Sequence, residues 1–191
     1  MFHSGQNVIG LPDWFRSITD QGGRGVQLFF ILSSLTLFLS LDHRSKLGDS
    51  SRDFYIRRFF RIAPMFYIGL LFYPFFMNLK DISIGNIFGT LSFIGNGFSP
   101  YWINSLVPGG WSITVEMTFY LFVPLLFRLI KDLKKSVLFL GASFIICMEI
   151  KVVLSRIHVI NDPFTWKIYL YSWFPNQFPI FALGIILFFL I

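Results

Sequence analysis

Three arginines lie close together ahead of an apolar run of the sequence. Arg57 and Arg58 precede Arg61 by four and three residues, and a helix brings residues at these spacings to one side. Guanidinium groups bind phosphate through charge and paired hydrogen bonds, so the cluster fits a phosphate-binding site. It also fits a cytoplasmic anchor whose cations contact lipid phosphates. The residues alone leave both interpretations open.

A polar stripe interrupts a strongly apolar segment further along the chain. Ser112, Glu116 and Tyr120 follow one another at four-residue spacing and would share one face of a helix. A helix-capping box would need the acid three residues after the serine, where Val115 stands, so capping does not explain Glu116. An acid inside a membrane span is costly and usually faces a cavity or a partner. The stripe therefore favours a functional site.

The composition identifies the kind of element that must position these residues. Of the 191 residues, 54% are hydrophobic, 20% are aromatic and only 14% are charged, whereas soluble domains carry about 25% charged residues. The mean hydropathy is +0.65, and the apolar residues form long runs instead of one stripe per helix. These features exclude a disordered chain and indicate an integral membrane protein.

Charge and cysteine content narrow the function classes. The net charge of +6 could suggest a nucleic-acid partner, but the basic residues lie mainly in two loops, as the positive-inside rule predicts. The single cysteine, Cys147, lies inside an apolar run, so no internal disulfide can form. No spacing of His, Cys or acidic residues resembles a metal site. We expect neither a nucleic-acid partner nor a bound metal.

We predict an all-α, polytopic transmembrane bundle with about five to six membrane segments of a larger bundle. A span needs about 20 mostly apolar residues, and six runs approach this length: 26–41, 62–77, 82–98, 111–130, 137–154 and 173–191. The third run is interrupted by glycines and is either a re-entrant segment or an irregular span beside a cavity. Placing the basic loops 42–61 and 128–135 in the cytoplasm makes the N-terminal segment external.

The chain is expected to be a fragment. It starts without a complete first span and stops inside the last apolar run. We therefore interpret residues 1–191 as a partial transmembrane domain that lacks the start of the first span and the C-terminal spans.

Four segments of the sequence follow one another in a recognisable order: GVQLFFILS (25–33), RRFFR (57–61), WSITVEMTFY (111–120) and NQFPIFALG (176–184). In this order they resemble the successive signatures of the membrane acyltransferase-3 family. The sequence departs from the family's pattern at three places: Gln27 replaces an acid, Ser34 replaces a glycine, and Met117-Thr118 replaces the second half of an acidic run.

The resemblance implies an integral membrane O-acyltransferase. Such proteins move an acyl group, often acetyl, from cytoplasmic acyl-CoA to a hydroxyl of a surface glycan or lipopolysaccharide sugar. Acyl-CoA would be a donor substrate, and no permanently bound cofactor is implied. The expected partners are the bilayer, acyl-CoA, a glycan or lipid-linked saccharide acceptor and, in a homo-oligomer, a second copy. We expect a multi-pass integral membrane protein of the bacterial inner membrane.

The resemblance also implies roles for individual residues. His3 lies 22 residues before Gly25 and matches the family's essential histidine, so it would act as a catalytic base, with Glu116 as the second catalytic residue. The three arginines would bind the phosphates of acyl-CoA. The expected acceptor-binding residues are Trp111, Ser112 and Tyr120.

Two other classes of protein fit parts of the sequence. In a transporter or glycan-export subunit, Glu116 and the arginines would line a permeation path. Alternatively, the chain is an inactive, truncated relic of an acyltransferase, because a base without its supporting residues is a poor catalyst.

Overall fold

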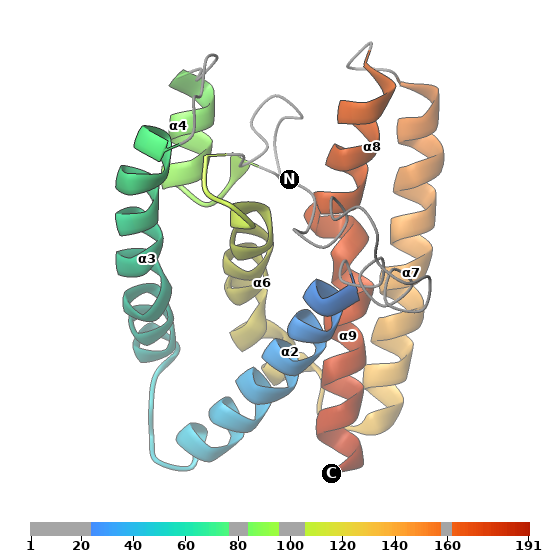
Figure 1. Ribbon diagram of the computed structural model, residues 1–191. Coiled ribbons are helices and arrows are strands. Elements are labelled where there is room, and N and C mark those ends of the chain that lie inside the picture. The colour runs from blue at the N-terminus through green and yellow to red at the C-terminus, as the bar shows by residue number, and fades with distance from the viewer. Residues whose placement is uncertain (1–23, 77–83, 96–105, 158–161) are drawn as a thin grey trace, which may run out of the picture.

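The regular structure is entirely helical in the residues described by the computed structural model, which are 24–76, 84–95, 106–157 and 162–191 (Figure 1). This confirms the all-α fold class. The helices are α2 (Arg24–Ser45), α3 (Ser51–Phe76), α4 (Ile84–Leu91), α6 (Gly110–Leu129), α7 (Leu133–Arg156), α8 (Pro163–Ser172) and α9 (Phe174–Leu190).

Four helical stretches of the described chain are long and apolar enough to cross a membrane. They are Arg24–Ser45, Gly110–Leu129, Leu133–Arg156 and Pro163–Leu190, the last comprising α8 and α9. The expected run 173–191 coincides with α9, and α8 extends the same apolar stretch by about three turns at its start. Residues 62–76 form the second half of α3, and α4, with eight residues, covers only about 12 Å. Within the described residues, the segment 82–98 thus contains no helix long enough to span.

The helices alternate in direction, and this places both basic turns at one end of the bundle (Figure 1). In that view α2 descends, α3 rises beside α6, α6 descends, α7 rises, and α8 and α9 descend. The turns between α2 and α3 and between α6 and α7 both lie at the lower end, whereas α7 ends and α8 begins at the upper end. This arrangement agrees with the expectation that the two basic loops share one side of the membrane.

An aromatic stack joins α2, α6 and α9 at the centre of the bundle. The Phe181 ring lies 4.0 Å from Phe119 and 4.6 Å from Phe30, centroid to centroid, and both pairs are stacked. All three side chains are fully buried. Such aromatic pairs contribute about 0.5–1.5 kcal/mol each beyond the area they bury. The stack therefore fixes the three helices relative to one another, one turn below Glu116.

A glycine allows α2 and α9 to approach closely. A Cβ at Gly184 would collide with Ser34 Oγ and the carbonyl oxygen of Ile31. At the same contact the Ser34 hydroxyl donates a hydrogen bond to the Phe181 carbonyl at 2.8 Å. Small residues and interhelical hydrogen bonds of this kind hold helices together in a membrane. This contact fixes the axial position and the rotation of α2 relative to α9, and hence the position of Ser33.

Candidate active site

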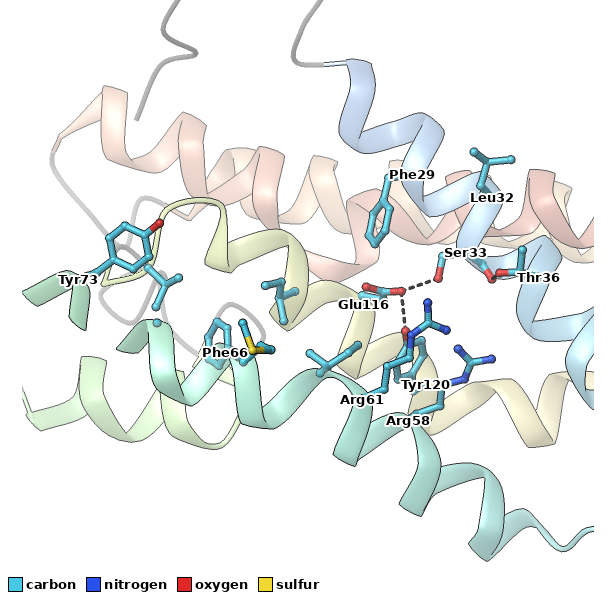
Figure 2. Close-up of a pocket in the computed structure, with 15 residues that line it drawn as sticks. Phe29, Leu32, Ser33, Thr36, Arg58, Arg61, Phe66, Tyr73, Glu116 and Tyr120 are labelled. Carbon is cyan, nitrogen blue, oxygen red and sulfur yellow. Dashed lines mark hydrogen bonds between the residues drawn. The ribbon is translucent and has the colours of Figure 1, made fainter. Parts of the chain in front are cut away.

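A cavity of about 550 Å³ lies between α2, α3 and α6 (Figure 2). This volume is within the range of small-molecule sites, about 300–1,000 Å³. Its polar residues gather at one end, whereas Phe66 and Tyr73 of α3 lie toward the other end. The polar lining consists of Ser33, Thr36, Arg58, Arg61, Glu116 and Tyr120. The cavity is therefore charged at one end and largely apolar along α3.

Glu116 is held by two hydroxyl groups from different helices. Ser33 Oγ of α2 and the Tyr120 hydroxyl of α6 each donate a hydrogen bond to Glu116 Oε1, both at 2.6 Å (Figure 2). Glu116 is only 6% exposed, and a buried carboxylate needs such donors. Oε2 receives no hydrogen bond from the described residues. The arrangement leaves one carboxylate oxygen free to act as an acceptor in the cavity.

Arg58 and Arg61 bring two positive charges to the polar end. Arg58 is half-buried and Arg61 is exposed. The Arg58 Cζ atom lies 5.9 Å from the ring centroids of both Phe54 and Tyr120, which is within the range of cation–π attraction. No carboxylate of the described chain forms an ion pair with either arginine. The two guanidiniums can therefore bind an external anion.

Arg57 has different surroundings. Its Nη2 lies 2.9 Å from Asp49 Oδ2, and Arg44 Nη1 lies 3.2 Å from the same oxygen. This carboxylate ties the end of α2 to the start of α3, and Arg57 does not line the cavity. Helical geometry alone does not separate Arg57 from Arg61, because residues four apart point only about 40° apart, and it is the pairing with Asp49 that directs the Arg57 side chain toward the end of α2. Of the three arginines expected on one side, the structure brings two to the cavity.

The expected acceptor-binding residues are also divided. Tyr120 lines the cavity, but Ser112 and Trp111 do not. The Ser112 hydroxyl donates to the Gly109 carbonyl at 2.8 Å. The Trp111 ring lies against Tyr171 at 5.5 Å and Phe30 at 6.2 Å. In these positions Ser112 supports the start of α6 and Trp111 packs α6 against α2 and α8.

His3 lies outside the described residues, so its role as a base stays a prediction. Elsewhere, the described chain contains no cluster of His, Cys, Asp or Glu suited to a metal ion.

The sequence reasoning did not assign Ser33 or Thr36 to the site, although both line the cavity. A signal was present, because Ser33, Thr36 and Ser40 recur at i, i+3 and i+7 within an apolar run. That spacing places polar groups on one helical face. It could not show that this face lies opposite Glu116.

The helices and the cavity define the class of the molecule as a multi-pass membrane protein with a charged, hydrogen-bonded site between its helices. A family model described as an acyltransferase domain matches residues 1–190. The chain therefore belongs to the membrane acyltransferase-3 family and is an acyltransferase domain. Comparisons with curated proteins and with solved structures found no match.

Proposed function

We propose that the chain lies in the bacterial inner membrane and transfers an acyl group from cytoplasmic acyl-CoA to a hydroxyl of a surface glycan or lipopolysaccharide sugar. The proposed acyl group is acetyl. The observation that carries this proposal is a pair of guanidiniums, Arg58 and Arg61, that form no ion pair with any described residue and lie at the polar end of an otherwise largely apolar cavity. Acyl-CoA has matching chemistry, because its phosphates are anionic and its thioester arm is long and less polar.

Arg58 and Arg61 bind the phosphates in this proposal. Arginine suits the task because its planar fork of N–H donors matches phosphate oxygens. Both residues lie in the first half of α3, which starts at the end that carries the two basic turns (Figure 1). By the positive-inside rule that end is cytoplasmic, and acyl-CoA is supplied there.

The apolar part of the cavity supplies a path for the thioester arm. Lining residues continue along α3 from Arg58 to Tyr73, a distance of about 22 Å at 1.5 Å per residue. An arm that enters this path brings its thioester into the bundle while its phosphates stay at the arginines. This supports direct threading of the donor and favours it over an acyl-protein relay.

The acyl transfer itself needs a base on the external side. His3 accepts the proton of the sugar hydroxyl as the hydroxyl oxygen attacks the thioester carbonyl. The carbon–sulfur bond then breaks, an ester forms, and the proton passes to the departing CoA sulfur. A well-placed base contributes about 10²–10⁴ in rate. Glu116 lies beside Arg58 at the polar end of the cavity (Figure 2), so the thioester arm must fold back toward that end for the free oxygen of Glu116 to orient the base or the sugar.

Two substitutions separate donor binding from proton transfer. His3→Ala and Arg58→Ala are both expected to abolish the transfer of labelled acetyl groups from acetyl-CoA to glycan in membrane vesicles. Only Arg58→Ala should weaken CoA binding, by about 10–100-fold, because it removes a charge-assisted hydrogen bond. CoA affinity is measured by calorimetry on the purified protein.

Matched controls are available in the same molecule. His43 is exposed at the end of α2, and Lys46 pairs with Asp42 outside the cavity. His43→Ala and Lys46→Ala should retain both transfer and CoA binding. Equal loss of CoA affinity in the His3 and Arg58 variants would contradict the division of roles. Movement of a saccharide across the vesicle membrane without acyl transfer would instead support a transporter.

A further inference from the structure

We propose that Ser33 and Tyr120 are positioning residues that hold the Glu116 carboxylate in its working orientation, and that Tyr120 also joins this acid to the arginine pair. The inference rests on the proposed function and extends it. It gives Ser33 a role that the sequence did not suggest. It also changes the role expected for Tyr120, from contact with the acceptor to support of Glu116.

The hydrogen-bond geometry distinguishes the two oxygens of Glu116. Ser33 and Tyr120 each have one hydroxyl hydrogen to donate, and both are directed to Oε1 at 2.6 Å. Oε2 is thus the oxygen that remains for a reacting group, such as the N–H of an imidazole or the hydroxyl of the acceptor.

Each donor is itself held in place by packing. Ser33 is followed by Ser34, which is fully buried and bonded to the Phe181 carbonyl at the close contact of α2 with α9. Tyr120 is only 4% exposed and packs edge-on against Phe54 at 6.3 Å. Because Ser34 anchors the α2 backbone beside Ser33 and the Tyr120 side chain is buried, the carboxylate is supported from two helices. Rigid support of this kind is what an acid needs to act at a defined position.

Tyr120 is the residue that contacts both halves of the site. Its hydroxyl bonds to Glu116, while its ring lies 5.9 Å from the Arg58 guanidinium. Phe54 offers a second ring to the same guanidinium at 5.9 Å. The aromatic faces orient Arg58, and no described carboxylate forms an ion pair with it, so its N–H groups stay available for an anion. The hydroxyl and the ring of Tyr120 therefore serve different functions, and substitutions can separate them.

Two substitutions of Tyr120 test this separation with acetyl-CoA as donor and membrane vesicles as the source of acceptor. Tyr120→Phe removes only the hydroxyl. It should lower the apparent kcat by about 10–100-fold, since a hydrogen bond to a charged group is lost, and leave the KM for acetyl-CoA within about twofold. Tyr120→Leu also removes the ring. It should lower kcat similarly and raise the KM for acetyl-CoA several-fold.

Ser33 gives an independent test with a conservative rescue. Ser33→Ala should lower kcat as Tyr120→Phe does, and Ser33→Thr, which keeps a hydroxyl, should restore most of it. Both donors serve one oxygen, so their effects should be coupled. The fold loss of kcat in the double variant Ser33→Ala/Tyr120→Phe should therefore differ from the product of the two single fold losses. Ser45→Ala is the matched control, since the Ser45 hydroxyl bonds within its own helix turn to Asp42 outside the cavity. It should leave kcat and KM unchanged.

Several results would overturn the positioning role while leaving the proposed function intact. One such result combines three findings: the wild-type protein transfers acyl groups, Arg58→Ala does not, and kcat stays within twofold in both Ser33→Ala and Tyr120→Phe. It would show that Glu116 needs neither donor. A higher KM with unchanged kcat in Tyr120→Phe would make Tyr120 a substrate-binding residue. Failure of Ser33→Thr to restore a folded, active protein would reject the role of Ser33. Absence of acyl transfer in the wild-type protein would instead refute the proposed function.

Discussion

At the scale of single residues, the surroundings of Arg57 and Arg58 show how adjacent cations acquire different roles. Arg57 is paired with Asp49 at 2.9 Å, whereas Arg58 is half-buried against two aromatic rings and has no ion pair within the described chain. An exposed ion pair contributes about 0–1 kcal/mol to stability. In the proposed function, the half-buried Arg58 guanidinium contributes to anion binding more than to stability.

Arg57→Ala and Arg61→Ala compare the paired Arg57 with the second arginine of the cavity, because each removes one positive charge from the same helix. Arg61→Ala should weaken CoA binding about tenfold or more, through the loss of a charge-assisted hydrogen bond. Arg57→Ala should change CoA affinity less than about threefold and lower stability by at most about 1 kcal/mol. Calorimetry and thermal unfolding measure the two effects. Equal weakening of binding would mean that the arginines act only through net charge.

At the scale of the elements, the close contact of α2 with α9 is the feature on which the site depends. α9 packs against both α2 and α7, and at Gly184 there is no room for a side chain. Ser33 is the neighbour of the Ser34 that bonds across this contact. A small separation of α2 from α9 would therefore move one of the two donors to Glu116.

Gly184→Ala is expected to lower both stability and activity. The new Cβ would force α2 and α9 apart, and overpacking of this kind costs about 1–3 kcal/mol. Gly141→Ala in α7 is the control, because nothing lies within 4 Å of its Cβ position and alanine favours a helix by about 0.5–1 kcal/mol. Thermal unfolding in detergent compares the variants. An unchanged midpoint in Gly184→Ala would show that the helices adapt without cost.

Asp162, the residue that precedes α8, is a pH-dependent group just outside the candidate membrane-spanning stretch Pro163–Leu190. Hydrogen bonds from the Thr165 hydroxyl, and then from the backbone amides of Thr165 and Phe164, lower the pKa of Asp162 below its ordinary value. A lowered pKa stabilises the folded state above the unfolded pKa of about 3.9. That stabilisation is lost as the pH falls through the lower, folded value.

Asp162→Asn should remove this pH dependence while keeping an acceptor at the helix start. In the wild-type protein, hydrogen exchange at the amides of Phe164 and Thr165 should become faster, relative to neighbouring amides, as the pH falls below about 4. The Asn variant should show no such relative change. The same acid-induced opening in both proteins would assign it to another group.

At the scale of the whole molecule, the direction of the helices gives the site two ends. The two basic turns lie together at the end where α3 begins, and α8 begins at the opposite end (Figure 1). In the proposed reaction, a donor bound by Arg58 and Arg61 enters from the basic end. The acceptor must reach the reacting atoms from the other side if the product is a surface glycan.

Cysteine labelling tests this orientation. Cys147 is the single cysteine, so Cys147→Ser gives a background without a thiol. In that background, Lys46→Cys and Lys134→Cys should be protected from a membrane-impermeant thiol reagent added to intact cells stripped of any outer membrane. Asp162→Cys should react. Labelling of Lys46→Cys and Lys134→Cys on opposite sides would contradict the shared position of the basic turns.

The sequence by itself determined the class of the molecule and the most conspicuous residue of its site. The bilayer accepts long apolar helices whatever their neighbours are, so composition and run length were enough to predict an all-α membrane bundle. Glu116 was predicted because an acid stands out in an apolar run. The family was predicted because its signatures are local segments in a fixed order.

Only the tertiary structure decided which residues share the cavity. Ser33 and Glu116 are 83 residues apart, and their contact depends on how α2 and α6 are rotated and packed. The same rotation turns Arg58 toward the cavity and Arg57 toward Asp49, and it leaves Ser112 bonded to its own turn. Spacing within one helix specifies a face of that helix. The packing of three helices specifies what the face meets.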